Sequence, residues 1–591
     1  MMSNKTRSGI EILFTALAIG IFGNLMLRQT PWGLNAFLFV TTFVAGMVAI
    51  AYRHRRELLT PRTLALHAAM LFFASMFLLR DSEQLLVFDT FAIIVIMGVL
   101  VLPNFGVNQR IAGAFHYGVG VLYAGLSSVL APFVLLGADI DWKEMPGNRV
   151  SKSAFSVLRG VAIALPLFLI FGALFMAADA AFENFANRVV NFDLETVISH
   201  VMLTSLFAWL TAGYFRGTLI EHLTKNAAAA VVSVVPKPEP AAAESETSFV
   251  DKFAAEPAED TSLPNNATVV EHINISDAPD PVKTDEPTPA AEPTARDWQN
   301  WDNTKFPAVF TLGTVETVII LGVLNVLFAS FVIFQLPYLF GGMDFVQNTP
   351  DLKLADFARR GFGELVWVSF LVLPMLLASH WLLRRDEPRN ETIFRVLAGI
   401  QVGLLFVIMA SAMQRLVLLT GELGYGWTTV RFYPMVMMIW LAVVFVWFGW
   451  TVLRGKRNNF AWGALWSAIA ILAVTNLLNP DDFIARKNIQ LMQQGREYDA
   501  YYNVQLSDDA VPAVIESLDA MNNEDRCSSM SFLYRRLLEA RSESDLRSFN
   551  FSRERAYDLL DARSGALING PGCTEYEPPA KLFLGEYGAG Q

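Results

Sequence analysis

The sequence is poor in the residues that most often build metal centres and disulfide frameworks. It has two cysteines and seven histidines in 591 residues, and the histidines lack the spacing of a zinc site. The sequence has no GxxxxGK[ST], GxSxG or HExxH motif and no kinase motif set. We therefore assign no catalytic residue, no cofactor and no metal. Whether the protein is an enzyme stays open, with the balance toward a protein without a catalytic centre.

Charged residues are sparse outside one segment. The net charge is -11, and residues 231–300 alone hold 14 acidic and 4 basic side chains. The rest of the chain is nearly neutral, which argues against nucleic-acid binding. The segment 225–303 consists largely of Ala, Pro, Glu, Asp and Thr, and this composition predicts a disordered acidic linker.

Long apolar runs dominate the remainder. Hydrophobic residues make up 53% of the chain, and the mean hydropathy is +0.38. Runs long enough to cross a bilayer alternate with short charged loops, so we predict an all-α, polytopic integral membrane protein with 11 or 12 spanning helices. The predicted spans are 10–27, 32–52, 63–79, 84–102, 156–178, 195–215, 307–334, 362–383, 392–420, 431–453 and 460–478.

One further apolar stretch, 118–136, decides the topology. It is long enough to cross, but it is rich in Gly and Ser and contains Pro132. All the strongest basic clusters fall on one side of the membrane only if this stretch does not cross, and they lie at 53–62, 143–159, 384–389 and 454–457. We therefore predict eleven crossings, with 118–136 as a re-entrant or interfacial segment. A twelve-crossing arrangement is the alternative.

The predicted organisation has four parts. An amino-terminal membrane half, 1–224, with about six spanning helices precedes the linker 225–303. A second half, 304–478, has five helices, and a soluble helical tail occupies 479–591. With a cytoplasmic amino terminus, eleven crossings place the linker in the cytoplasm and the tail outside it.

Within the tail, Ser507 to Asp509 precede a proline in the first turn of a predicted helix, and amphipathic helices are predicted at 527–543 and 551–563. The tail also holds Cys527 and Cys573. In an extracytoplasmic, oxidising compartment these two cysteines are able to form a disulfide. The sequence leaves open whether they do.

Several charged side chains fall inside predicted spans, where an ion costs about 2.5–3.5 kcal/mol on insertion scales. Glu316 is predicted to be the most deeply buried carboxylate. Glu364 and Arg415 lie at matched depth on neighbouring antiparallel segments, so they are able to pair. Such a pair fixes the helix register or forms part of a substrate or ion site. In a third alternative, both side chains face an outer vestibule and have neither role. Asp89, five residues into its predicted segment, is a weaker case of the same kind.

Several motifs together resemble a known family. They are FGALFMAADAAF at 171–182, LGTVETVIILGVLNVLFASFVIFQLPYLFGG at 312–342, ADFARRGFGELV at 355–366, SAMQRLVLL at 411–419, YGWTTVRFY at 425–433, NPDDFIARKNI at 479–489 and LSDDAVP at 506–512. The sequence is similar to a bacterial multi-pass membrane family of unknown function, the domain of unknown function of the 4153/4173 type. The resemblance implies a bacterial inner-membrane location, and it marks motif positions Glu316, Arg359, Arg360, Glu364, Arg415, Tyr425 and Arg431.

Three functions remain open on this evidence. The first is a sensor, regulator or scaffold in the bacterial inner membrane. The second is a transporter of a small or anionic solute that uses the intramembrane Glu and Arg side chains, and the third is an enzyme acting on envelope or lipid-linked substrates. Arg359, Arg360 and Arg431 form a predicted outer rim suited to an anionic ligand. The expected partners are the lipid bilayer and proteins that bind the acidic linker or the tail, and the oligomeric state is left open.

Overall fold

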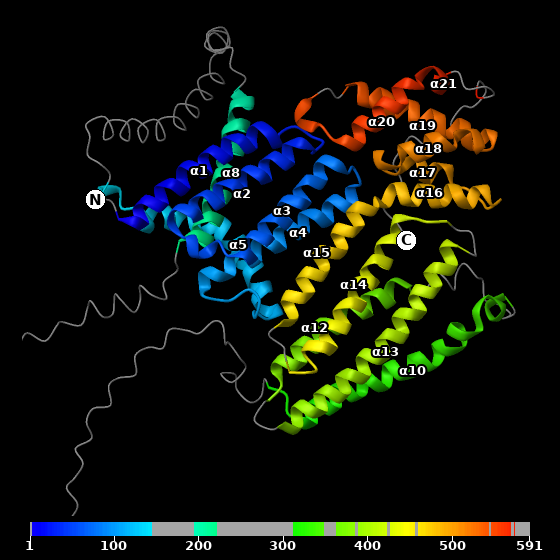
Figure 1. Ribbon diagram of the computed structural model, residues 1–591, viewed down its shortest axis with the longest axis horizontal. Helices are drawn as coiled ribbons and strands as arrows, with labels where there is room; N and C mark the ends of the chain where they lie inside the picture. The colour runs from blue at the N-terminus through cyan, green and yellow to red at the C-terminus, as the bar shows by residue number, and fades with distance from the viewer. Residues whose placement is uncertain are drawn as a thin grey trace, which may run out of the picture. The chain divides into compact units, whose positions relative to one another are not determined.

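The computed structural model describes residues 3–144, 194–220, 311–347, 362–384, 388–421, 426–455, 459–542, 545–568 and Cys573, with the backbone alone for 143, 194–195, 335–347, 362–364 and 568. Across these ranges the chain forms helices, and β-structure is limited to one isolated bridge between Leu312 and Leu383 (Figure 1). Eleven of the described helical segments are long and apolar enough to cross a membrane. The protein is an all-α polytopic membrane protein, as predicted from the sequence.

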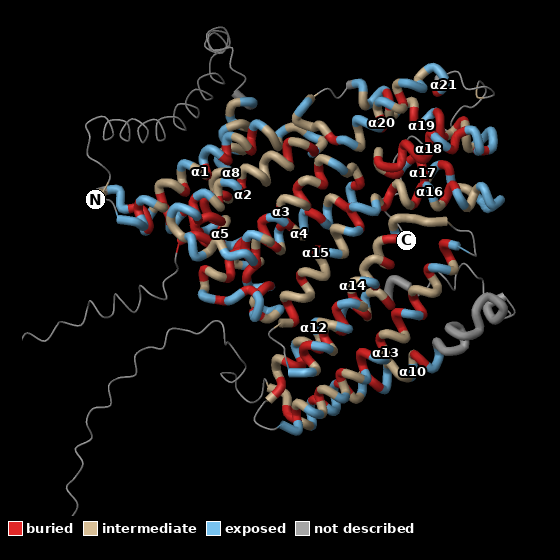
Figure 2. The backbone as a smooth tube through the Cα atoms, in the orientation of Figure 1, coloured by how far each residue is buried: buried red, intermediate tan, exposed pale blue. Residues whose placement is uncertain are grey.

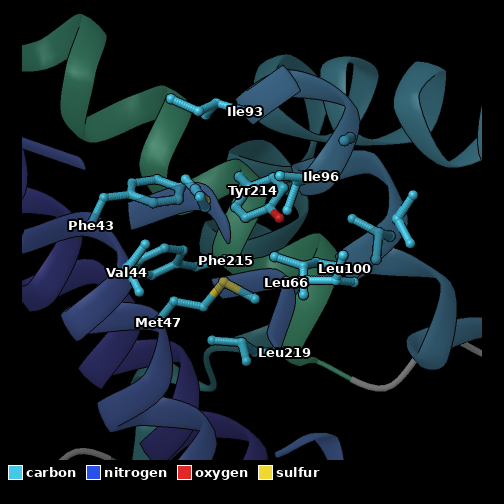
Figure 3. Close-up of a cluster of buried hydrophobic side chains, with 14 of the residues drawn as sticks. Phe43, Val44, Met47, Leu66, Ile93, Ile96, Leu100, Tyr214, Phe215 and Leu219 are labelled. Atoms are coloured by element: carbon cyan, nitrogen blue, oxygen red, sulfur yellow. The ribbon is translucent and has the colours of Figure 1, made fainter. Parts of the chain in front are cut away.

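The amino-terminal half contains six long helices. They are α1 (Asn4–Leu27), α2 (Leu34–His54), α3 (Pro61–Leu79), α4 (Glu83–Val101), α5 (Ala114–Val134) and α8 (Leu194–Leu219). Helix α1 packs along α8, and each of α1 to α3 packs against the next helix in the chain. Figure 3 shows the core between α2, α3, α4 and α8, where Phe43 lies against Tyr214 and Phe215. The predicted span 156–178 and the linker lie outside the described residues.

The carboxy-terminal half contains five long helices with a second hydrophobic core. They are α10 (Thr314–Gln347), α12 (Phe362–Leu382), α13 (Pro388–Thr420), α14 (Thr429–Thr451) and α15 (Phe460–Leu478). Helix α15 belongs to both halves. Its Leu465 and Ile469 are part of the first core, whereas its Phe460 is part of the second.

The tail folds into six helices around a third core, which we call the cap. They are α16 (Pro480–Gln493), α17 (Ala500–Gln505), α18 (Val511–Ser517), α19 (Asn523–Ser542), α20 (Phe551–Ala562) and α21 (Ser564–Ile568). Helices α19 and α20 match the predicted amphipathic segments, and Pro512 stands in the first turn of α18. Figure 2 shows α18 as one of the most completely buried helices of the cap.

The helix ends lie on two faces. The basic face is defined by Ser3, Arg55, Asn104, Leu219 and Leu383, and the cap face by Leu27, Arg80, Leu194, Thr420 and Leu478. At the basic face, Arg55 donates to the carbonyl oxygen of Leu219 at 3.2 Å. At the cap face, the Nε of Arg80 donates to the carbonyl oxygen of Asn476 at 2.9 Å, which joins the two halves.

Helix α5 contains residues 118–134 of the stretch 118–136, and both ends of the surrounding segment lie at the basic face. Before the helix, Asn108 accepts a hydrogen bond from Arg62 at 3.0 Å. After the helix, the chain passes through a π-helical turn, Leu135–Asp139, and Glu144 accepts from the backbone N–H of Ser3 at 2.8 Å. By length and composition alone, Ala114–Asp139 qualifies as a candidate span.

Two close contacts hold α5 against its neighbours. Gly98 of α4 packs against the backbone of Val121, and Gly213 of α8 packs against the carbonyl oxygens of Ser127 and Ser128. A Cβ on Gly213 would lie 2.3 Å from the Ser128 oxygen. Helices α4 and α8 therefore approach α5 closely at glycines, and small residues at such contacts are common in membrane bundles.

We predict that Gly213→Ala destabilises the protein by about 1–3 kcal/mol, because the added methyl group forces α5 away from α8. The matched control is Gly125→Ala, since a Cβ on Gly125 meets no atom within 4 Å. The control is expected to be neutral or stabilising by up to about 1 kcal/mol. Thermal unfolding of the purified protein in detergent measures both. Equal melting temperatures for the two variants would contradict this packing.

Candidate functional site

The cap is fastened to the amino-terminal half by Asp509, in the motif LSDDAVP. One carboxylate oxygen, Oδ2, accepts hydrogen bonds from the backbone N–H groups of Asp81 at 2.8 Å and Ser82 at 3.2 Å. The other, Oδ1, accepts from the hydroxyl of Ser552 at 2.8 Å and lies 3.6 Å from Nη1 of Arg80. Asp509 therefore binds the unpaired N–H groups at the start of α4, where the helix dipole favours a negative charge.

Asn550 makes a second attachment at the same place. Its Nδ2 donates to the carbonyl oxygens of Phe77 and Arg80, each at 2.8 Å, at the end of α3. Its Oδ1 caps α20 by accepting from the backbone N–H groups of Ser552 and Arg553. One side chain thus closes the end of a membrane helix and the start of a cap helix.

The loop between α1 and α2 is bound to the cap as well. The N–H of Leu34 donates to the carbonyl oxygen of Phe549 at 2.8 Å, and Nη1 of Arg547 donates to the carbonyl oxygen of Leu25 at 2.7 Å. Both described loops of the first half on the cap face are therefore held by the cap.

A layer of polar groups lies below this attachment, between the two halves. Asp89 of α4 is fully buried, and its Oδ1 accepts from Nδ2 of Asn476 on α15 at 2.8 Å. Its Oδ2 has no hydrogen-bond partner among the described residues. The hydroxyl groups of Ser82 and Tyr433 lie 3.4 Å apart and connect α4 with α14. We call Ser82, Asp89, Tyr433, Asn476 and Asp509 the cap junction.

Two carboxyl groups beside the junction have perturbed acidity. Burial, reinforced by the negative charge of Asp508, raises the pKa of Asp81 to about 7, although Arg553 opposes the shift. Burial also raises the pKa of Asp481. Two hydrogen bonds that its carboxylate accepts from Ser507 oppose this shift, one from the hydroxyl at 2.6 Å and one from the backbone N–H at 3.2 Å. In the folded protein these groups hold protons that exposed carboxyl groups would release.

A cavity of about 620 Å³ lies between the first turn of α14 and the cap helices α16, α17 and α19. One wall is fixed by Asn488, which accepts from the N–H of Trp427 at 2.6 Å and donates to its carbonyl oxygen at 2.9 Å. We call this cavity the cap pocket. Its lining includes Arg431, the aromatic residues Trp427, Tyr498, Tyr501 and Tyr502, and the acidic residues Glu497, Asp499, Glu524 and Asp525.

The predicted deep burial of Glu316 is wrong. Its helix begins at Thr314 rather than near Pro307, so Glu316 stands in the first turn of α10. The side chain is exposed, and its Oε2 accepts from the N–H of Gly313 at 3.0 Å. Glu316 therefore acts as a helix-start carboxylate, which is an ordinary role for an acidic residue at that position.

The other predicted charges are only partly described. Glu364 and Arg415 fall near the start of α12 and the end of α13, at the same end of this helix pair, but the side chain of Glu364 lies outside the described residues. Their pairing therefore stays a prediction. Arg359 and Arg360 lie outside the described residues too.

Arg431 lines the cap pocket, and its Nη1 donates to the carbonyl oxygen of Gly426 at 2.5 Å. Among the described lining residues, four carboxylates share the pocket with this arginine. At the cap, Cys527 and Cys573 are joined by a disulfide with their Cα atoms 5.3 Å apart. No group of three or more potential metal ligands occurs in the part of the chain that the structure describes.

These features define a class, namely a polytopic helical membrane protein whose carboxy-terminal cap binds back onto its first half. The chain belongs to the family described as Domain of unknown function (DUF4153), whose profile matches residues 66–234 and 286–517. The match extends from α3 to α18, so it includes the whole cap junction, and α19 to α21 lie beyond it. This confirms the family predicted from the motifs. No curated protein and no solved structure matches the chain.

We predict that Asp509→Ala destabilises the cap by about 3–5 kcal/mol, because it leaves two backbone N–H groups and Arg80 without their buried acceptor. The control is Asp482→Ala, which removes a partly exposed ion pair with Arg486 within one helix and is expected to cost less than about 1 kcal/mol. Limited proteolysis of the cap reports the difference. Equal cleavage rates in the two variants would refute the role of Asp509.

We predict that the cap is held more firmly at about pH 5.5 than at about pH 7.5. Folding raises the pKa values of Asp81 and Asp481, so the folded protein binds their protons more tightly than the unfolded chain does. Their contribution to folding stability is therefore complete below the pKa of an unfolded Asp, near 3.9, and it is lost as the pH rises through the pKa values of the folded protein. Asp81→Asn removes one titrating group and should flatten the dependence of the melting temperature on pH. An unchanged slope in this variant would show that Asp81 does not titrate as described.

Proposed function

We propose that this protein is a sensor or scaffold of the bacterial cytoplasmic membrane, with its basic face toward the cytoplasm and its cap outside. The sidedness is supported by the distribution of arginines. Counting the described helix ends together with the loops between them, the cap face carries Arg28, Arg80 and Arg431, whereas the basic face carries Arg7, Arg53, Arg55, Arg56, Arg62, Arg110, Arg384, Arg389 and Arg454. The disulfide in the cap fits an oxidising compartment.

The same orientation accounts for α5. Since Asn108 and Glu144 both lie at the basic face, α5 enters the bundle and the chain leaves on the side where it entered. This favours a re-entrant or interfacial segment over a crossing. The described ends at Glu144 and Leu194 then lie on opposite faces, as one crossing by the predicted span 156–178 requires. The acidic linker is on the cytoplasmic side in this arrangement, where it is available to protein partners.

The observation that carries the sensor proposal is the position of the cap pocket. The pocket is lined jointly by the first turn of a membrane helix and by the cap, and the N–H of Thr429 in α14 donates to the hydroxyl of Tyr502 in α17 at 2.7 Å. A solute bound there contacts both parts at once. Its binding energy therefore acts on the position of α14 relative to the cap, which is the requirement for coupling a ligand to a membrane helix.

The charge balance of the described lining favours a cationic solute over the anionic ligand expected from the sequence. Four carboxylates outnumber one arginine, and aromatic rings bind cations through their faces. Burial raises the pKa of the Asp525 carboxyl group.

A transporter is the second candidate, and one observation favours it. Gln401 on α13 is fully buried among membrane helices, and neither its Nε2 nor its Oε1 has a hydrogen-bond partner among the described residues. An unpaired buried amide is costly, so such groups often mark a bound solute or water.

Two measurements test the proposal. A fluorescent-protein fusion in the linker and an alkaline-phosphatase fusion after Gln591 should both be active, because the two positions lie on opposite sides of the membrane. Spermidine, used as a cationic probe, should raise the melting temperature of the full-length protein in nanodiscs. The stabilisation should be lost in Glu497→Gln/Glu524→Gln and kept in the charge-matched control Glu516→Gln/Glu539→Gln.

Three outcomes count against the proposal. A fluorescent fusion after Gln591 would refute the orientation. Equal stabilisation of the two double variants by spermidine would refute the cap pocket as the sensing site. Solute flux in proteoliposomes that Glu316→Gln or Gln401→Ala abolishes would replace the sensor with a transporter.

A further inference from the structure

An apolar crevice of about 490 Å³ runs between the two membrane halves. One side is formed by α4 and the start of α5, and the other by α12, α14 and α15. Typical lining residues are Phe91, Val95, Leu373, Met437, Leu465 and Leu472. The lining extends along α15 from Phe460 to Thr475, which is about 22 Å at 1.5 Å per residue.

The crevice exists because the two halves have separate cores. The residues buried in the first half and those buried in the second form two distinct clusters, and α15 contributes to both. Outward-facing apolar side chains therefore remain in the space between α4 and α14. The lining is predominantly apolar, and its described polar side chains are Tyr117, Tyr433, Trp440 and Thr475. At membrane depth such a space offers water few hydrogen-bonding partners, so hydrocarbon is the favoured occupant.

The two ends of the crevice differ. At the cap face its wall includes Tyr433, whose hydroxyl is paired with Ser82 in the cap junction. At the basic face the wall is formed by Ala114, Tyr117 and Phe460. Close by in the chain stand two exposed arginines, Arg110 just before α5 and Arg454 just after α14, and Arg454 lies 4.0 Å from the ring of Trp450.

We propose that the crevice binds one anionic phospholipid, with an acyl chain between the halves and the phosphate at the basic face near Arg110 and Arg454. Arg110 precedes the lining residue Ala114 by four positions and Arg454 precedes the lining residue Phe460 by six, so both belong to the basic face at which the crevice ends. Basic groups at such a membrane surface attract anionic headgroups. The chain fills the space between the two cores and adds apolar contacts that the side chains do not make. This lipid site is independent of the cap pocket and of the sensor proposal.

The test uses the full-length protein purified from nanodiscs that contain phosphatidylglycerol and phosphatidylethanolamine in equal amounts. Native mass spectrometry then counts the lipids that remain bound. The wild-type protein should retain one phosphatidylglycerol with a preference of at least about tenfold over phosphatidylethanolamine. Arg110→Gln/Arg454→Gln should keep a bound lipid and lose the preference.

A crevice-filling variant, Ala468→Trp, should lose the bound lipid, because Ala468 lines the crevice. The matched control on the same helix is Val474→Trp, which is 63% exposed outside the crevice and should retain the lipid. Ala468→Leu gives a smaller filling group if the tryptophan variant does not fold.

Several results would overturn the proposal. One is a wild-type protein without retained lipid, and another is equal retention in the folded Ala468 and Val474 variants. Equal retention of the two phospholipids by the wild-type protein would refute the anionic headgroup.

Discussion

The buried carboxylate of Asp509 is the interaction on which the arrangement of this protein depends. Its side chain is only 1% exposed. It accepts hydrogen bonds from two backbone N–H groups and a hydroxyl, and it forms an ion pair with the guanidinium group of Arg80. A buried charge is stable only when it is paired in this way. Because its partners at Asp81 and Ser82 precede it by more than 400 residues, the tail must be in place before the start of α4 is complete.

The second membrane half is attached in a different manner. It has its own core. Its described contacts with the first half include those of α15, the Arg80–Asn476 hydrogen bond, the cap junction, and the ring contacts Phe88–Tyr433 and Phe115–Trp381. Interhelical hydrogen bonds in membranes contribute only about 1 kcal/mol each. The two halves are therefore held together by a few polar and aromatic contacts and a shared helix rather than by a common core, which explains why an apolar crevice remains between them.

Much of this fold could be predicted from the sequence, because hydrophobic run length and helical periodicity are local properties. These two properties predicted the membrane helices and the amphipathic helices α19 and α20. The depth of Glu316 was misjudged because a helix start cannot be located within an apolar run, and α10 begins at Thr314.

The cap junction could not be predicted, because its partners come from distant parts of the chain. The sequence marked Asp89 as an intramembrane carboxylate, but its full burial beside Asn476 of the other half depends on packing between distant segments. Asp509 lies in a recognisable motif, but nothing in that motif indicates which loop its side chain binds.

Native-state hydrogen exchange tests the central claim, that the cap and the first membrane half form one cooperative unit joined at Asp509. The amides to follow are those of Asp81 and Ser82, which bind Asp509, and that of Leu34, which binds Phe549. These amides should lose protection in the same denaturant-dependent step as the amides of cap helix α18. Loss of protection in α18 while Asp81, Ser82 and Leu34 stay protected would show that the cap opens independently and would contradict the account.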